Sequence, residues 1–188
     1  MLCKEDKKID QIILQPYSDD WADMFNSIAK KNRKELGEVA IRIDHIGSTS
    51  ISGLAAKPII DIQISVKSLD KIDEFRIPLE RLGYVYKSDN PEKTKRYFRE
   101  KPGDSRIHIH VRKFGSWHQQ FPLLFRDYLR CHPLEIRLYE NEKYRLAEIY
   151  KDNRSAYVEG KNVIFWDIMY RADRWASQTG WETGPSDT

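Results

Sequence analysis

The stretch His45–Val66, HIGSTSISGLAAKPIIDIQISV, decides how this chain folds, because it joins two strand patterns through a short turn rich in glycine and hydroxyl groups. Before the turn, Ala40–Ile46 alternates between hydrophobic residues and polar ones. After the turn, Ile59–Val66 alternates again, and its polar positions are Asp61, Gln63 and Ser65. Because successive side chains of a strand point to opposite faces, we predict two strands, each with one hydrophobic and one polar face.

The rest of the chain passes from mixed strands and helices to helices alone. The turn Lys101–Asp104, KPGD, predicts a hairpin between strands Lys95–Arg99 and Arg106–Val111. Periodicity and end signals predict the other elements, which are a short strand over 12–14, helices over 21–36 and 69–82, a strand over 84–87, and helices over 117–131, 133–151 and 155–175. This order predicts an α+β fold with a mixed sheet and flanking helices. We expect an α/β core over 1–116, a C-terminal helical segment over 117–176 that packs on it, and a flexible tail over 177–188.

The composition is typical of a globular domain in water, since 40% of the 188 residues are hydrophobic and 32% are charged. No hydrophobic run approaches the length of a membrane span, and the charged start MLCKEDKKID lacks the core of a signal peptide. Cys3 and Cys131 are the two cysteines, so we expect no disulfide framework and a cytoplasmic location. The net charge of +3 is too small to favour a nucleic-acid partner.

Two histidines share the polar face of the strand Arg106–Val111, namely His108 and His110. If this strand lies beside Ile59–Val66, the two histidines join Asp61 and Gln63 in one polar patch on the sheet. Carboxylate and imidazole groups bind divalent ions, and they can also hold the proton of a nucleophile. A polar sheet face that only meets water is the other interpretation, and the residues alone leave both open.

The turn between the first two strands has the features of a phosphate-binding loop. Glycine lets a backbone come close to an anion, and hydroxyl groups with free N–H groups can bind phosphate oxygens. Lys57 adds a positive charge nearby. Turns of this composition are common, so the position between two strands carries the prediction. The predicted phosphate-binding residues are Gly47, Ser48, Thr49, Ser50 and Lys57.

A resemblance becomes specific when these patterns are taken together. A hydrophobic residue followed by Gly47-Ser48, with an acid on the next strand, resembles the nucleotidyltransferase superfamily, which includes DNA polymerase beta-like and antibiotic-modifying enzymes. The longer text HIGSTSISGLAAKPIIDIQISV, with RIHIHV and LLFRDYLRCHP further on, is similar to the GrpB family, a bacterial group placed in that superfamily. The resemblance covers nearly the whole chain, to about Trp175, and implies a nucleotidyltransferase-like fold.

The resemblance also implies chemistry, which is transfer of a nucleotidyl group from an NTP, expected to be ATP, to a small acceptor with the help of Mg²⁺ or Mn²⁺. Gly47 and Ser48 would contact the β- and γ-phosphates, and Asp61 would be the first metal ligand. Gln63 departs from the pattern, which has a second acid there. A neutral amide binds Mg²⁺ less well than a carboxylate, and His108 and His110 favour softer ions such as Mn²⁺ or Zn²⁺.

Further cations are candidates for contacts with phosphate. Lys143 and Lys161 each lie within the apolar stripe of a predicted helix, where a lysine commonly extends its ammonium to the edge. The match of both to the family pattern implies instead that they point into the cleft. Arg126 either completes this set or forms an ion pair with Asp127. Arg96 and Arg99 lie on opposite faces of one strand, so at most one should reach the site.

Three functions remain open from the sequence. The first is a metal-dependent nucleotidyltransferase, and the second is a nucleotide- or phosphate-binding protein that has lost transfer activity, as Gln63 suggests. The third is a metal-dependent phosphohydrolase that uses Asp61 and the two histidines. We expect the aromatic residues Trp117, Tyr128 and Trp166 to belong to the core rather than to a base-stacking site.

Overall fold

The computed structural model describes residues 11–188, and its centre is a five-stranded sheet in the order β1-β2-β5-β4-β3. β2 and β5 are parallel, whereas the other neighbouring pairs are antiparallel. The strands are β1 (Arg42–Ile46), β2 (Ile60–Val66), β3 (Val85–Tyr86), β4 (Lys95–Arg99) and β5 (Ile107–Lys113). The predicted α+β fold with a mixed sheet is therefore confirmed, as is the hairpin between β4 and β5.

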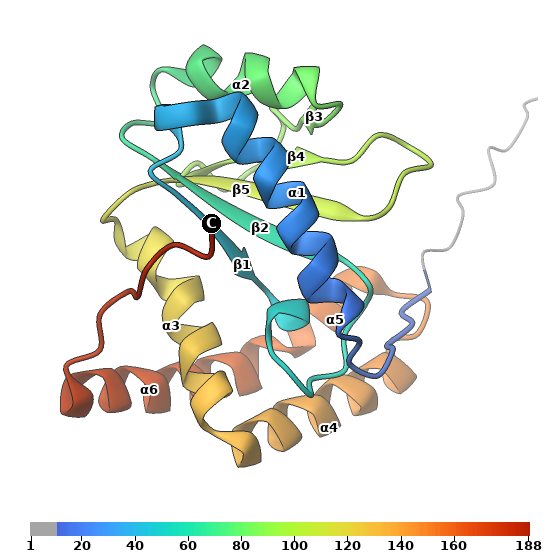
Figure 1. Cartoon of the computed structure of the whole chain (residues 1–188). Helices are drawn as coiled ribbons and strands as arrows, with labels where there is room; N and C mark the ends of the chain where they lie inside the picture. Colours follow the sequence, from blue (N-terminus) through green and yellow to red (C-terminus); the bar gives the residue numbers. More distant parts are fainter. Residues whose placement is uncertain (1–10) are drawn as a thin grey trace, which may run out of the picture.

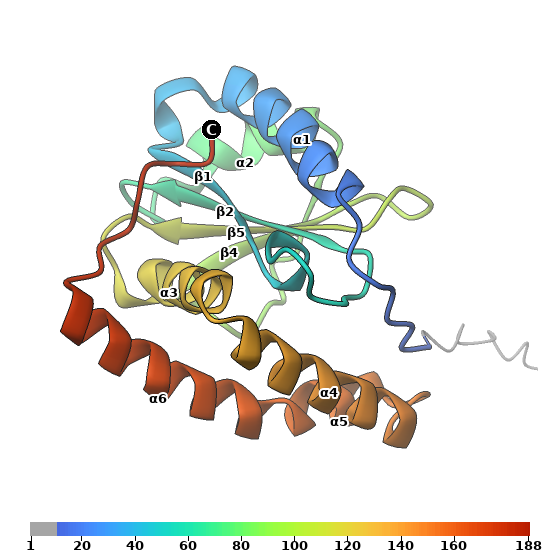
Figure 2. The same cartoon turned by 60° about the horizontal axis from the view of Figure 1, so that its bottom comes forward.

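Helices cover both faces of this sheet (Figures 1 and 2). One face is covered by α1 (Asp20–Leu36) and α2 (Ile72–Arg81). On the other side lie α3 (Trp117–Cys131), α4 (Pro133–Ile149), α5 (Arg154–Gly160) and α6 (Asn162–Thr179). Two short 3₁₀ turns, η1 (Gly37–Val39) and η2 (Ser48–Ser50), flank β1. Figure 2 shows the sheet between these two helical layers.

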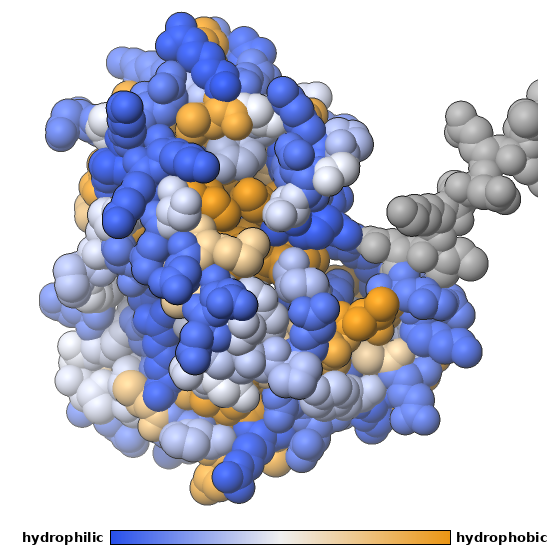
Figure 3. Space-filling view, turned by 45° about the vertical axis from the view of Figure 1, so that its right-hand side comes forward, coloured by the Kyte–Doolittle hydropathy of each residue, from blue (hydrophilic) through white to orange (hydrophobic). Residues whose placement is uncertain are grey.

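The main core lies between the sheet and the pair α1 and α2, because the hydrophobic face of β2 points there. Ile62 and Ile64 are fully buried, and they belong to one cluster with Phe25 of α1 and Phe75 of α2. Burial of each such side chain contributes about 1.5–3 kcal/mol, which is enough to determine which face of the strand turns inward. Figure 3 shows an outer face on which hydrophilic side chains predominate. Because the hydrophobic face of β2 points toward α1 and α2, its polar face points toward the helices that follow β5.

Strand register brings the polar residues of β2 and β5 together. Asp61 pairs with His108, and Gln63 pairs with His110. Since paired residues of neighbouring strands point to the same face, the predicted polar patch exists. It faces the C-terminal helices.

The last predicted helix differs from the structure, which has two helices there. α5 ends at Gly160 and α6 begins at Asn162, so Lys161 lies at the junction rather than within one continuous helix. A side-chain carbon on Gly160 would lie 2.8 Å from Cδ2 of Leu146 in α4, so the Leu146 side chain would have to shift to accept it.

Two smaller expectations also need correction. The predicted strand over 12–14 is only an isolated bridge between Gln15 and Ala56. Of the three aromatic residues expected in the core, Tyr128 is buried, but Trp117 and Trp166 are 57% and 58% exposed. Both indole rings pack against Phe121, with ring centroids 5.4 Å away, and otherwise face outward.

The last residues contact the sheet, which differs from the expectation of a flexible tail. α6 continues to Thr179, and the Trp181 indole then donates to Asp127. Beyond it, the Ser186 hydroxyl contacts both the N–H and the carbonyl of Ile43 on β1. The segment therefore covers the outer edge of β1, which would otherwise present unpaired backbone groups.

Within residues 11–188, no helix combines the length and the hydrophobicity needed to cross a membrane. Cys131 is an exposed free thiol. Cys3, the other cysteine, lies outside the described residues.

Candidate functional site

The candidate site is centred on Asp61 in β2, which is flanked by two histidines from β5. Oδ1 of Asp61 lies 3.1 Å from Nδ1 of His108 and 3.5 Å from Nε2 of His110. The Asp61 side chain is 26% exposed, so a ligand can reach it. Parallel pairing of β2 with β5 produces this arrangement, because it puts Asp61, His108 and His110 on the same face of the sheet.

These three side chains fit a divalent ion. One carboxylate oxygen and one ring nitrogen from each histidine lie within 4.8 Å of one another. Among the described residues, Nε2 of His108 and Nδ1 of His110 are buried without a hydrogen-bond partner. Two imidazoles with one carboxylate form a donor set typical of Mn²⁺, Fe²⁺ or Zn²⁺ more than of Mg²⁺, which prefers oxygen ligands.

The charges of Asp61 and His110 suit such an ion. Burial acts to raise the pKa of Asp61, but the hydrogen bonds from His108 and His110 outweigh it and hold the pKa of this carboxyl well below its usual range. Burial lowers the pKa of His110, although Asp61 opposes the shift. Asp61 is therefore ionised and His110 neutral at pH 7, and these are the protonation states that bind metal.

The turn before β2 brings backbone next to Asp61. Gly47 has a φ of 73°, which favours glycine, and a side-chain carbon there would lie 2.5 Å from Oδ2 of Asp61. Ser48 begins η2 and lines the same small cavity as Asp61, whose volume is about 90 Å³. The predicted phosphate loop thus lies beside the predicted metal ligand.

The other two hydroxyl groups of the turn are occupied within the protein. The Thr49 hydroxyl donates to the Ile59 carbonyl and contacts Nε2 of His45, and Thr49 is buried. The Ser50 hydroxyl donates to the Gly47 carbonyl. Ser48 is therefore the residue of the turn that lines the cavity, whereas Thr49 and Ser50 hold the shape of the turn.

Three lysines surround this cavity, as the sequence predicted for Lys57, Lys143 and Lys161. The ring of Tyr157 lies between two of them, with the Nζ atoms of Lys57 and Lys161 at 5.2 and 4.9 Å from its centroid. Nζ of Lys143 donates to the Ala55 carbonyl and lies 5.3 Å from the Tyr139 ring. The C-terminal segment thus brings Lys143 and Lys161 to the same cavity as the carboxylate of β2.

The lysines are buried enough for their protonation to change. Burial and, as a smaller cause, repulsion from Lys161 together lower the pKa of Lys143 to about 7. Burial also lowers the pKa of Lys161, whereas Asp61 acts to raise it. An anion in the cavity would stabilise both charged forms, which is a property expected of a phosphate site.

Gln63 lies outside the cavity, although it shares the face of Asp61. Its side chain is fully buried, and its amide nitrogen donates to the Gln119 carbonyl of α3 at 2.8 Å. α3 covers this part of the sheet, so the structure does not bring Gln63 to the ligands in the way the sequence predicted. Sequence alternation identified the face but not the helix that covers it.

The predicted arginines are divided among different places. Arg126 is buried and donates to the His45 carbonyl and to Asp187 in the C-terminal segment, so it serves as a structural ion-pair partner. Arg96 pairs with Val111 on the hydrophobic side of the sheet. Arg99 pairs with His108 and is on the site face, where its guanidinium contacts Glu100. The expectation that at most one of these two arginines reaches the site face is consistent with the register.

Several residues around the site were not predicted from the sequence. The Tyr97 ring of β4 lies 5.6 Å from that of His108 and 5.2 Å from that of His110. Tyr157 separates two lysines, and Tyr139 hydrogen-bonds with Ser48. Alternation along Lys95–Arg99 already places Tyr97 on the face of Arg99, so this signal was available. For the tyrosines of α4 and α5, only helix packing reveals the contact.

Known proteins resemble this chain at the levels of family and fold. The GrpB protein family matches residues 11–171. UPF0157 protein YqkA of Bacillus subtilis is 37% identical over 166 residues, which cover 88% of this chain and 48% of YqkA, so the chain spans about half the length of that relative. The crystal structure of the conserved protein GrpB from Enterococcus faecalis is 32% identical, with a TM-score of 0.79, over 87% of this chain and 99% of that one.

A solved structure of lower sequence identity shares the fold of this chain. Terminal uridylyl transferase 4 from Trypanosoma brucei, with bound dUTP, is 12% identical and has a TM-score of 0.53 over 88% of this chain and 56% of that chain. At this identity the likeness concerns the fold alone, which is nucleotidyltransferase-like. Because the family match covers residues 11–171, the chain belongs to the GrpB family.

Proposed function

We propose that this protein is a metal-dependent nucleotidyltransferase that moves a nucleotidyl group from an NTP, such as ATP, to a small acceptor. The observation that carries the proposal is the cavity lined by Asp61, Lys143 and Lys161, with Ser48 of the preceding turn also in its wall. An ionised carboxylate with two imidazoles offers a metal site, and the lysines offer a site for the phosphates of the same ligand.

In this proposal each part of the chain has one task. Asp61, His108 and His110 would hold a divalent ion such as Mn²⁺ or Mg²⁺, which when bound polarises the phosphate and steadies its charge. Ser48, Lys143 and Lys161 would bind and orient the β- and γ-phosphates. The acceptor oxygen forms a bond to the α-phosphorus as the bond to the bridging oxygen breaks. The hydroxyl proton passes to water, and pyrophosphate leaves.

A binding protein without transfer activity is the second candidate, and Gln63 is the observation that favours it. The superfamily pattern has an acid at this position, whereas here the amide is buried under α3. Asp61 is the single carboxylate of the Asp61–His108–His110 group, so a two-ion arrangement lacks its second acidic ligand among the described residues. Nucleotide binding is common to both candidates, and turnover separates them.

Calorimetry of ATP with Mn²⁺ or Mg²⁺ tests nucleotide binding. We expect the wild-type protein to bind the metal–nucleotide complex and Asp61→Asn to bind it at least about tenfold more weakly, which corresponds to about 1.4 kcal/mol. Asp104→Asn, in the exposed turn of the hairpin, removes the same charge and should leave binding unchanged. If the wild-type protein binds no NTP with either ion, the proposal is wrong.

Product analysis then separates the activities. A transferase releases pyrophosphate only when an acceptor is present, whereas a phosphohydrolase releases phosphate without one. Nucleotide binding with neither product across an acceptor panel would identify the binding protein.

A further inference from the structure

Gln63 belongs to a row of polar side chains that crosses the sheet one step beyond Asp61. The strand register places Asp44 of β1 on one side of it and His110 of β5 on the other. The row continues with Tyr97 of β4. Paired residues of neighbouring strands point to the same face, and the strands are about 4.8 Å apart. Gln63 is therefore the residue of β2 that lies beside His110.

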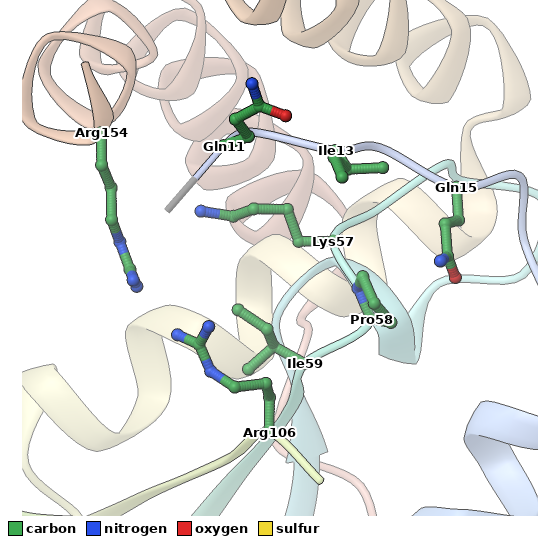
Figure 4. Close-up of a pocket in the computed structure, with 8 residues that line it drawn as sticks. All are labelled: Gln11, Ile13, Gln15, Lys57, Pro58, Ile59, Arg106 and Arg154. Carbon is green, nitrogen blue, oxygen red and sulfur yellow. The ribbon is translucent and has the colours of Figure 1, made fainter. Parts of the chain in front are cut away.

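This row lies deeper in the fold than the end at which β2 and β5 begin. Figure 4 shows that end, where Ile59 and Arg106 border a second cavity of about 200 Å³ that Arg154 of α5 also lines. Asp61 follows two residues after Ile59, and its side chain is 26% exposed. Gln63 follows two residues later and is fully buried beneath α3. It can therefore affect a bound ligand only through a neighbouring side chain.

The two ends of the Gln63 amide have different surroundings. Nε2 donates to the Gln119 carbonyl of α3 at 2.8 Å, and this contact orients the amide. Oε1 is buried and has no hydrogen-bond partner among the residues that the structure describes. Asp44 cannot provide one, because both of its carboxylate oxygens accept from the Arg42 guanidinium. Since buried acceptors in folded proteins are paired, a donor for Oε1 is expected nearby.

His110 has the complementary orphaned atom. Its Nε2 lies 3.5 Å from Oδ1 of Asp61, on the side where an ion would bind. Its Nδ1 is buried and likewise has no partner within residues 11–188. A neutral imidazole has one N–H group and one lone pair. When Nε2 offers its lone pair to an ion, Nδ1 carries the proton and requires an acceptor, and Oε1 of Gln63 is an acceptor on the neighbouring strand.

The opposite tautomer suits this environment less well. With the proton on Nε2, the lone pair at Nδ1 and the carbonyl oxygen of Gln63 would be two neighbouring acceptors without a proton between them. The amide cannot turn its NH₂ group toward His110 without losing the hydrogen bond to Gln119. A competing donor for Oε1 is Nε2 of Gln119, which is also buried without a partner among the described residues.

We propose that Gln63 is a positioning residue of the metal site, whose Oε1 accepts a hydrogen bond from Nδ1–H of His110, directly or through one water, and so directs the Nε2 lone pair toward the ion. This role rests on the metal site of the proposed function but not on nucleotide transfer. It also explains an amide at this position. A carboxylate could accept from His110, but it could not donate to the Gln119 carbonyl as well.

NMR of the imidazole nitrogens in the metal-free protein tests the tautomer. Protein labelled with nitrogen-15 histidine is measured at mildly alkaline pH, where His110 is neutral because burial lowers its pKa. His110→Asn identifies the signals. We expect the wild type to carry the proton on Nδ1, and Gln63→Met to show a mixture of tautomers. The proposal is overturned if the wild type carries the proton on Nε2, or if Gln63→Met has the wild-type tautomer.

Ser65→Ala is the matched control for the NMR measurement. Ser65 is on the same strand and the same face as Gln63, and it is also fully buried, but its partner on β5 is Arg112 and not a histidine. We expect this variant to leave the His110 signals unchanged. A shift as large as that in Gln63→Met would assign the effect to general packing and overturn the proposal.

Calorimetry with Zn²⁺ alone measures the consequence for the ion. We expect Gln63→Met to bind Zn²⁺ about tenfold more weakly than the wild type, and Ser65→Ala to bind it equally well. Gln63→Glu keeps an acceptor for His110 and loses the contact with Gln119, so it should bind more tightly than Gln63→Met even if urea unfolds it more easily. Equal affinities of Gln63→Met and the wild type, or equal losses in Gln63→Met and Gln63→Glu, would overturn the proposal.

Gln119→Met tests the competing donor, because it removes the side-chain Nε2 but keeps the backbone carbonyl that Gln63 contacts. We expect a wild-type tautomer of His110 and wild-type Zn²⁺ affinity, and losses equal to those in Gln63→Met would overturn the proposal. Nucleotide enters none of these measurements. If no NTP binds while the Zn²⁺ affinities differ as expected, the proposed function fails and the positioning role remains. If the wild type binds neither Zn²⁺ nor Mn²⁺, the positioning role is overturned.

Discussion

Gly47 lies directly against Asp61, such that a side-chain carbon on Gly47 would be 2.5 Å from Oδ2 and 3.0 Å from Cβ and Cγ of the carboxylate residue. The residue that begins the predicted phosphate turn thus also determines where the predicted metal ligand can lie. Since Oδ1 contacts both histidines, a displacement of Asp61 would disturb these contacts as well.

Gly47→Ala should therefore weaken metal and nucleotide binding strongly. The added carbon forces Asp61 to move. In addition, the positive φ of 73° strains an alanine backbone by about 1–2 kcal/mol. We expect at least a tenfold loss of Mn²⁺–ATP affinity by calorimetry. Gly53→Ala is the matched control, because Gly53 also has a positive φ, of 79°, but has open space around it. Equal binding losses in the two variants would show that backbone strain alone is responsible.

Lys143→Met should stabilise the protein below pH 7. Burial lowers the pKa of Lys143 to about 7 in the folded state, against 10.5 for an ordinary lysine, so the unfolded chain binds more protons between these values. Stability of the wild type consequently rises with pH across this window, and the cost of the charge is complete below pH 7. We expect the free energy of unfolding to increase by about 1–3 kcal/mol, a value that allows for the lost hydrogen bond to Ala55.

Urea unfolding at several pH values measures this effect. The advantage of Lys143→Met should disappear as the pH approaches 10.5, whereas Lys151→Met, at an exposed position, should show no pH-dependent difference. A constant difference between variant and wild type at all pH values would contradict the lowered pKa.

Gln63→Asp should destabilise the protein without adding transferase activity. The aspartate is shorter, cannot donate to the Gln119 carbonyl, and puts a charge at a position with no exposure. We expect a loss of about 2–4 kcal/mol in urea unfolding, because a buried charge without a partner is costly. Gln63→Met, which loses the hydrogen bond but adds no charge, should lose less. New pyrophosphate release in Gln63→Asp, at unchanged stability, would indicate that α3 yields and that the carboxylate reaches the metal ligands.

Asp187→Ala should loosen the C-terminal segment from β1. Oδ2 of Asp187 accepts from the backbone N–H of His45 at 2.8 Å and from Arg126 at 2.7 Å. Loss of both hydrogen bonds leaves the buried guanidinium of Arg126 with one acceptor fewer. We therefore expect a decrease of about 1–3 kcal/mol in the free energy of unfolding. Glu182→Ala, an exposed acid of the same segment, is the control. Unchanged stability in Asp187→Ala would mean that the segment contributes nothing to the fold.

Much of the sheet follows from local patterns in the sequence. Alternation along Ile59–Val66 correctly separates the hydrophobic face of Ile62 from the polar face of Asp61. The same reasoning separates Arg96 from Arg99. Such patterns have a period of two residues, so the neighbouring five or six residues contain the information. The break between α5 and α6 at Gly160 is different, because Gly160 faces Leu146 of another helix and no local pattern contains that contact.

The sequence by itself determined the family, the α+β architecture, and the polar face that carries Asp61, His108 and His110. Tertiary structure decided which members of that face meet the cavity. α3 covers Gln63, the C-terminal segment engages Arg126, and α5 brings Arg154 to a second cavity. The physical reason is that strand alternation is a local property of the backbone. The helix that covers a given position is instead chosen by packing between segments far apart in the chain.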